Sequence, residues 1–185
     1  MKSSTIVDFE QALFLLDKKL DIAGINKIQI RAIGGFAMMY YGFRDNGYTI
    51  DIDSLTTKYP VEVLKIIREV AFEMGLDEDW LNTDCSTLEG FMTPLADQIV
   101  WEKAKYDFNN IDMKVANVAG LIRSKAKAIE DGGLVPRSTD KKDLLAGLNH
   151  VNIHSADALK ESTEYSFIIK EYPRCFEFLE KADRW

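Results

Sequence analysis

The first part of the chain predicts a helix followed by a strand. In residues 5–23, apolar side chains recur at steps of three and four, which is typical of an amphipathic helix. Gly24 follows and is expected to end that helix. Residues 28–33 alternate between apolar and polar side chains and are rich in β-branched residues, which indicates a strand.

A Gly-Gly pair separates this strand from the next predicted elements. Gly34 and Gly35 are expected to form a sharp turn that leads into a short buried helix over residues 36–43. A second strand is predicted over residues 48–53, with apolar side chains on one face and acidic ones on the other.

The rest of the chain predicts further strands and then helices only. The expected elements are a helix from Pro60 to Gly75, an irregular stretch over 77–94, strands over 98–101 and 111–115, and helices over 118–129, 138–148, 156–161 and 165–181. Ser138 or Thr139 is the expected cap of the second of those helices.

These elements predict an α/β (α+β) fold with a mixed sheet, flanking helices and a helical C-terminal part. We expect residues 1–118 to form the α/β core. Residues 119–185 are expected to pack on that core as helices, so that the chain is one compact unit.

Composition and charge limit the partners. Hydrophobic residues make up 46% of the chain and charged residues 29%, values that argue against disorder. The net charge of -7 does not predict a generally basic nucleic-acid-binding face. A polyanionic substrate would need a local basic patch or bound metal. A nucleotide carried as its metal complex, or a basic protein partner, fits the acidic total better.

The two cysteines, Cys85 and Cys175, lie far apart and show no zinc-binding spacing. They are expected to be inert. The N-terminus lacks the apolar core of a signal peptide, and no apolar run reaches the length of a membrane span. A cytoplasmic protein without membrane contact is therefore expected.

Candidate chemistry lies around the Gly-Gly pair and the second strand. Glycines between a strand and a helix let backbone N–H groups approach a phosphate closely. Alternation along a strand puts Asp51 and Asp53 on one face. Two carboxylates at that spacing can hold Mg²⁺, or Mn²⁺, which prefer oxygen ligands. Such an ion bridges a triphosphate during phosphoryl transfer.

Over roughly residues 28–148, the sequence resembles the minimal nucleotidyltransferases of the polymerase-β superfamily, in particular AbiEii-type toxins and related bacterial nucleotidyltransferases. The resemblance rests on the segments that follow: Gly34-Gly35, Tyr41-Gly42, Thr49 with Asp51-Ile52-Asp53, Trp80-Leu81-Asn82, the helical segment Leu121–Lys125, and Arg137–Leu144 with its Arg-x-x-Asp-x-x-Asp-Leu pattern.

The resemblance implies a role for each matching residue. Gly34 and Gly35 would hold the triphosphate, with Arg44, Thr49 and Arg137 as further nucleotide-binding residues. Asp51 and Asp53 would bind the metal, and Lys125 would neutralise phosphate charge. Asp140 or Asp143 would complete the polar site or hold Lys125 and Arg137 in place, and the sequence leaves the choice between the two aspartates open.

The sequence departs from the family pattern at two points. The family often has an arginine two residues before the threonine, where this chain has Gly47. The nearest arginine is Arg44, which an insertion in the turn would deliver to the site. A third strand carboxylate has no clear counterpart. Asp112 is the best candidate, with Asp107 behind it.

Three hypotheses follow. The first is an enzyme that transfers a nucleoside monophosphate from an NTP to an RNA, protein or small-molecule acceptor, with the toxin of a toxin–antitoxin pair as a reasonable role and an antitoxin protein as partner. The alternative is a catalytically degenerate protein of the same fold that acts as a nucleotide- or partner-binding module. In the third, Asp51 and Asp53 are a solvated sheet edge and the chain is a partner-binding subunit.

Overall fold

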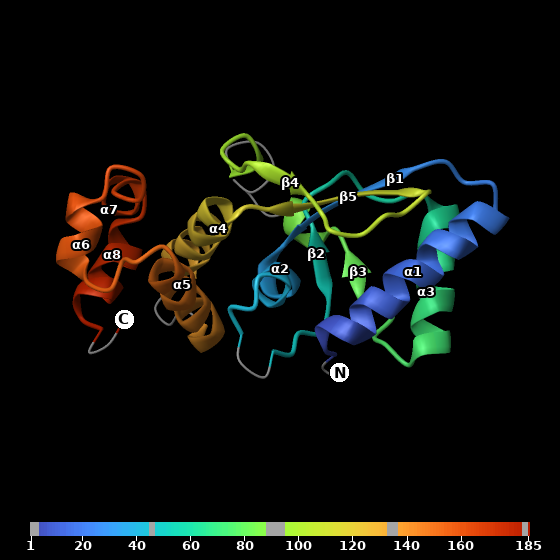
Figure 1. Ribbon diagram of the computed structural model, residues 1–185, viewed down its shortest axis with the longest axis horizontal. Coiled ribbons are helices and arrows are strands. Elements are labelled where there is room, and N and C mark those ends of the chain that lie inside the picture. Colours follow the sequence, from blue (N-terminus) through green and yellow to red (C-terminus); the bar gives the residue numbers. More distant parts are fainter. Residues whose placement is uncertain (1–3, 45–46, 88–94, 133–136, 183–184) are drawn as a thin grey trace. The chain divides into compact units, whose positions relative to one another are not determined.

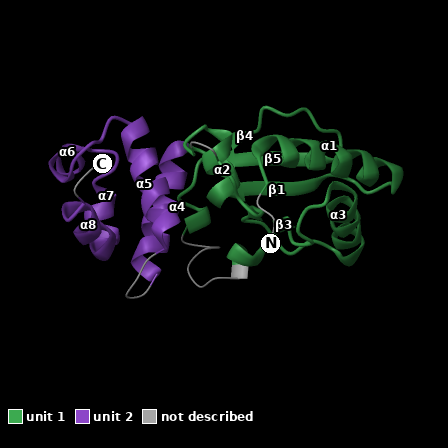
Figure 2. Cartoon of the chain, turned by 90° about the horizontal axis from the view of Figure 1, so that it is seen from below, with its two compact units in different colours: residues 1–117 green, residues 118–185 purple. Residues whose placement is uncertain are grey.

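The computed structural model describes residues 4–44, 47–87, 95–132, 137–182 and 185. The chain divides into two compact units, residues 1–117 and 118–185 (Figure 2). The first holds a mixed sheet with flanking helices and the second is helical, which confirms the predicted fold class. The boundary lies one residue from the predicted one. The packing of the helical part on the core stays a prediction.

The first unit is built on a five-stranded mixed sheet of order β3-β2-β1-β5-β4 (Figure 1). β1 is parallel to β5 and antiparallel to β2, β2 is parallel to β3, and β4 is antiparallel to β5. The strands are β1 (Ile28–Ile33), β2 (Ile52–Ser54), β3 (Leu81–Asn82), β4 (Trp101–Lys103) and β5 (Ile111–Ala116).

The helices that accompany the sheet within the described residues include one short 3-10 helix. They are α1 (Ile6–Ile22), α2 (Gly34–Tyr40), α3 (Val61–Met74) and η1 (Asp84–Thr87). Thr5 begins α1 with a capping box: its hydroxyl accepts from the Asp8 N–H, and the Asp8 carboxylate accepts from the Thr5 N–H. Phe9 of α1 packs edge-on against Phe36 of α2 and stacks on Trp80, so aromatic rings join the elements of this core.

The central strands bury one face and leave part of the other accessible. Ile30 and Met113 represent the buried face. Between such residues lie the partly or fully exposed Gln29, Arg31 and Asp112. This alternation is the pattern of a sheet whose helices cover one side.

In the described part of the second unit, five helices surround a core of their own. They are α4 (Val118–Asp131), α5 (Ser138–His150), α6 (Ala156–Glu161), α7 (Phe167–Glu171) and α8 (Pro173–Glu180). Leu144, Leu148, Leu159, Ile168 and Leu179 are fully buried in this core. None of the helices in the described ranges, in either unit, has the length and apolar character that crossing a membrane requires.

The region around the Gly-Gly pair differs from the prediction. Gly34 and Gly35 are the first residues of α2 rather than a turn before it, and the helix ends at Tyr40 because Gly42 has a left-handed φ of 73°. The strand predicted over 48–53 is limited to Ile52–Ser54. Thr49 instead pairs with Ser4 through two backbone hydrogen bonds of 2.8 and 3.2 Å, which removes this segment from the sheet.

Later elements also needed correction. The strand predicted over 98–101 begins at Trp101, because Gln98 and Ile99 donate to Leu95 and Ala96 in a turn. Neither Ser138 nor Thr139 caps α5: Arg137 occupies the N-cap position. The single helix predicted over 165–181 is two helices, since Pro173 has no N–H to continue the preceding helix.

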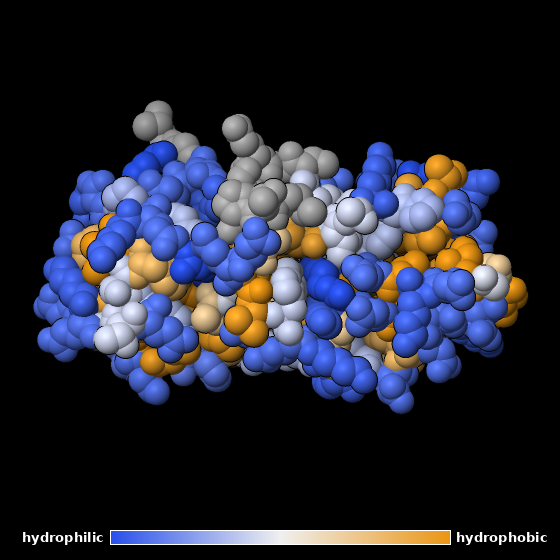
Figure 3. Space-filling model, turned by 90° about the horizontal axis from the view of Figure 1, so that it is seen from above, coloured by the Kyte–Doolittle hydropathy of each residue, from blue (hydrophilic) through white to orange (hydrophobic). Residues whose placement is uncertain are grey.

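The exposed large apolar side chains among the described residues all belong to the first unit. Phe72 is the most exposed of them, at 89%. Figure 3 shows one face of the molecule, on which hydrophilic side chains dominate and hydrophobic ones form small separate groups.

Candidate functional site

Gly34 and Asp53 meet where β1 leads into α2. Asp53 on β2 is the register partner of Ile33, so its side chain lies beside the next residue of the chain. A β-carbon at Gly34 would overlap Asp53 Oδ2 and lie 3.3 Å from its Cγ. Gly34 also has a φ of 68°, which L side chains rarely adopt. Glycine at this position therefore makes room for the carboxylate.

Gly35 makes the same kind of room for Arg44 and Thr49. A β-carbon there would overlap Thr49 Oγ1 and lie 2.8 Å from Arg44 Nη1. Arg44 Nη1 also donates to the Tyr48 carbonyl at 3.0 Å, which fixes the guanidinium group. Arg44 therefore lies beside the Gly-Gly pair.

Asp51 lies directly before β2 and is held by a side chain that the sequence did not assign. Asn82 Nδ2 donates to Asp51 Oδ2 at 3.1 Å, and Asn82 is the register partner of Asp53 on β3. Asn82 is fixed in turn, because its Oδ1 accepts from the Asp84 N–H at 3.0 Å. Ile52, between the two aspartates, is fully buried, while both aspartates are partly exposed.

Asp112 is placed apart from this pair. Its register partner on β1 is Gln29, four residues from Ile33, which corresponds to about 13 Å along the strand. Arg31 Nη2 forms an ion pair of 2.8 Å with Asp112 Oδ2. Hydrogen bonding to Arg31 lowers the pKa of the Asp112 carboxyl below its usual value. Asp107 is exposed in the connection between β4 and β5.

The remaining predicted residues form a cluster within the second unit. Lys125 on α4 is buried, and its Nζ lies 2.8 Å from both Asp140 Oδ1 and Asp143 Oδ2 on α5. Asp140 also accepts from Arg137 Nε at 2.7 Å. Both aspartates therefore hold Lys125, and Asp140 holds Arg137 as well. The Arg137 side chain remains 77% exposed.

Cys85 and Trp80, to which no catalytic role was assigned from the sequence, are both buried. Cys85 of η1 is close enough to be affected by the Asp53 charge, and burial together with that charge raises the pKa of its thiol to about 12. This agrees with the expected inert cysteine. Trp80 is fully buried and donates to the Ile67 carbonyl at 3.0 Å, as a core residue.

The donor set around Asp51 and Asp53 suits a hard cation. Both side chains offer carboxylate oxygens. The Asn82 amide that donates to Asp51 is the kind of outer partner that orients a metal-binding carboxylate. Within the described ranges, no group of three or more His, Cys, Asp or Glu side chains is positioned to hold a metal ion. If a Mg²⁺ or Mn²⁺ ion were bound at this point of the sheet, Asp51 and Asp53 are the residues that would offer it carboxylate oxygens.

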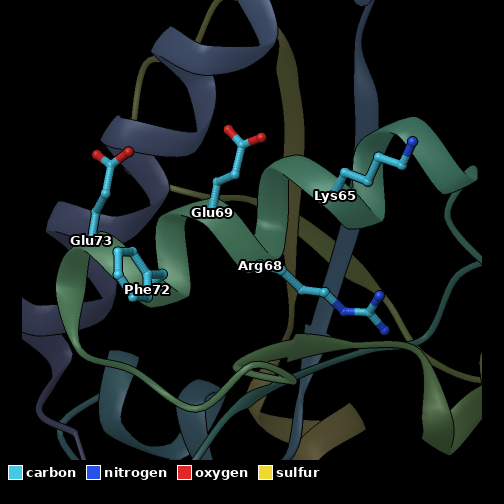
Figure 4. A pocket seen from close by; sticks show the side chains of 5 residues that line it. All are labelled: Lys65, Arg68, Glu69, Phe72 and Glu73. Carbon is cyan, nitrogen blue, oxygen red and sulfur yellow. The ribbon is translucent and has the colours of Figure 1, made fainter.

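A hollow of about 460 Å³ on α3 lies outside this constellation (Figure 4). It is lined by Lys65, Arg68, Glu69, Phe72 and Glu73. Two cations and two anions share the lining, and Lys19 already pairs with Glu69 and Glu73. None of the predicted site residues belongs to it.

Comparison with protein-family models, with curated proteins and with solved structures found no match to this chain.

Proposed function

We propose that this chain is a metal-dependent nucleotidyltransferase, which transfers a nucleoside monophosphate from an NTP to an acceptor and releases pyrophosphate. The observation that carries the proposal is that three side chains meet the Gly-Gly pair where α2 begins. Asp53 lies against Gly34, and Arg44 and Thr49 lie against Gly35. Anionic oxygens for a cation, a guanidinium group for a phosphate and two residues without side chains are thereby combined.

In this proposal Asp51 and Asp53 hold the cation and the Gly-Gly pair adjoins the triphosphate. When bound, Mg²⁺ or Mn²⁺ supplies neutralisation of the triphosphate and of the charge that develops during transfer. Arg44 binds a phosphate oxygen with a guanidinium group that the Tyr48 carbonyl already orients. The Thr49 hydroxyl donates a hydrogen bond to the nucleotide, and Asn82 keeps Asp51 in position.

Within the second unit, we assign an anion-binding role to Arg137. Two buried carboxylates compensate the charge of Lys125, which makes Lys125 the centre of the cluster. Arg137 is fixed at one end by Asp140 and is exposed over most of its surface, so its remaining N–H groups are accessible to a phosphate. Asp140, Asp143 and Lys125 position it.

The acceptor is an RNA, a protein or a small molecule. A toxin role with an antitoxin partner fits the sequence resemblance, and the net charge of -7 suits a basic partner. Incubating the purified chain with Mg²⁺, bacterial RNA and protein tests the reaction. Label from the α-phosphorus of an NTP should enter an acceptor, whereas label from the γ-phosphorus should leave as pyrophosphate. Transfer of the γ-label would indicate a kinase and contradict the proposal.

One observation favours the alternative of a nucleotide-binding module without catalysis. Asp112, the best sequence candidate for a third carboxylate, is engaged by Arg31 and lies about 13 Å along β1 from the register position of Asp53. The two functions separate in one comparison. A module binds NTP in the presence of Mg²⁺ and is stabilised by it against heat, yet produces no labelled acceptor.

A further inference from the structure

A row of cations crosses the accessible face of the sheet. Arg31 on β1 and Lys114 on β5 are register partners, and Lys114 is also the register partner of Lys103 on β4. Register partners project from the same face, so the three side chains form one row across three strands. Together with Lys27, directly before β1, we call these residues the basic strip.

The strip carries a net positive charge in an acidic chain. Three of the four cations act on the one carboxylate among them, that of Asp112: hydrogen bonding to Arg31, and the charges of Lys114 and Lys27, lower its pKa. Among the described residues, Arg31 alone of the four cations forms an ion pair. Directly opposed like charges destabilise a sheet. The pairing of Lys114 with Lys103 therefore costs stability that a bound polyanion would restore.

The strip lies close to the proposed reaction site. Arg31 is two residues from Ile33, the register partner of Asp53, which is about 7 Å along β1. Trp101 shares the strand and the face of Lys103, is partly exposed, and provides a ring on which a base can stack. Exposed Gln29 beside Asp112 offers an amide for a 2′-hydroxyl.

We propose that the basic strip binds the phosphate backbone of a single-stranded RNA, and that this RNA is the acceptor. The second half of the proposal rests on the proposed nucleotidyltransferase function. A sheet face with cations and an aromatic ring is a surface that suits unpaired RNA, since the bases of unpaired RNA are free to stack. The net charge of the chain confines such binding to a local basic patch, and the strip is one.

Fluorescence anisotropy of a short labelled single-stranded RNA, with the full chain and without NTP, tests the binding. The variant Lys103→Glu/Lys114→Glu should raise the Kd at least about tenfold. It should also reduce the slope of log K against log[salt] by about 1.4, the value for two lost phosphate contacts. The matched control Lys18→Glu/Lys65→Glu changes the same amount of charge on exposed positions of α1 and α3. It should change the Kd less than about twofold.

If charge reversal lowers the thermal midpoint of unfolding, Lys103→Gln/Lys114→Gln serves as a second variant. This variant should also weaken RNA binding. Equal weakening by the strip and control variants, or no binding by the wild type, would overturn the proposal. Equal or tighter binding of DNA of the same sequence would overturn the assignment to RNA.

The outcome for the strip can be told from the outcome for catalysis. Asp51→Asn/Asp53→Asn should keep wild-type or tighter RNA binding, because it removes only negative charge. RNA binding without any nucleotide transfer would refute the proposed function and leave the strip intact. Transfer to a protein or small molecule by a chain that does not bind RNA would refute the strip alone.

Discussion

Gly34 lies so close to Asp53 that a β-carbon on residue 34 would overlap the carboxylate of residue 53. Gly34→Ala should therefore displace Asp53 and reduce nucleotide transfer by at least about tenfold, a loss of about 1.4 kcal/mol of transition-state stabilisation. Positive φ adds about 1–2 kcal/mol of destabilisation. Transfer rates and thermal melts of the purified variant measure both effects.

Gly42→Ala is the matched control for that variant. Gly42 has a φ of 73°, close to that of Gly34, but a β-carbon there would meet nothing within 4 Å. It should show the destabilisation of about 1–2 kcal/mol without the loss of transfer. Equal transfer rates in the two variants would show that the approach of Gly34 to Asp53 has no role in the reaction.

Asn82 should affect metal binding through Asp51. Asn82→Ala removes the hydrogen bond of 3.1 Å to Asp51 Oδ2, and loss of such an orienting partner typically lowers metal affinity or activity by about 10–100-fold. Titration of Mn²⁺ in the presence of NTP, followed by paramagnetic resonance, measures this affinity. Asn109→Ala, at an exposed position, should bind Mn²⁺ as the wild type does. Unchanged affinity of Asn82→Ala would remove Asn82 from the site.

Lys125 should be essential to the stability of the second unit. Lys125→Met removes the ammonium group that Asp140 and Asp143 share, and breaking a buried ion pair costs about 3–5 kcal/mol. Hydrogen exchange of α4 and α5 amides should accelerate accordingly. Lys127→Met breaks an ion pair with Asp131, whose side chain is 52% exposed, and should cost less than about 1 kcal/mol. Similar exchange in both variants would contradict the buried cluster.

The Arg31–Asp112 pair predicts a pH dependence of the first unit. The folded-state pKa of Asp112 is lowered, so the pair contributes stability above the unfolded pKa, near 3.8, and loses it as pH falls through the folded pKa. Because Asp112 is 38% exposed, the contribution should be at most about 1 kcal/mol. At neutral pH, the free energy of unfolding of Asp112→Asn, measured in urea, should be lower than that of the wild type by this contribution. In acid the two free energies should be equal. Asp97→Asn, at an exposed position, should follow the wild type throughout.

Local patterns were sufficient for most elements and failed where distant segments meet. Strand β1 and helix α6 have the predicted bounds, because periodicity and flanking residues determine them. The strand predicted over 48–53 began too early, since Thr49 pairs with Ser4, and no local pattern encodes that partner. The two-residue strand β3 is too short to show a period, so the role of Asn82 beside Asp51 was not foreseen.

The candidate site shows the same limit. Gly34, Gly35 and Asp53 were identified from a spacing that the antiparallel register of β1 and β2 explains. The position of Arg44 depended on the path of a turn, and the choice between Asp140 and Asp143 depended on how α4 and α5 pack. Both are tertiary facts. Asp112 suited the sequence pattern of a third carboxylate, but its pairing with Arg31 became visible only in the sheet.

The most direct test of the central claim is nucleotide transfer by Asp51→Asn/Asp53→Asn. Wild type, this variant and the exposed control Asp97→Asn/Asp131→Asn, which removes the same charge, are each incubated with Mg²⁺ and α-³²P-labelled NTPs in the presence of RNA and protein. The account predicts label in an acceptor with wild type and control, and none with the Asp51/Asp53 variant. Full labelling by the Asp51/Asp53 variant would contradict it.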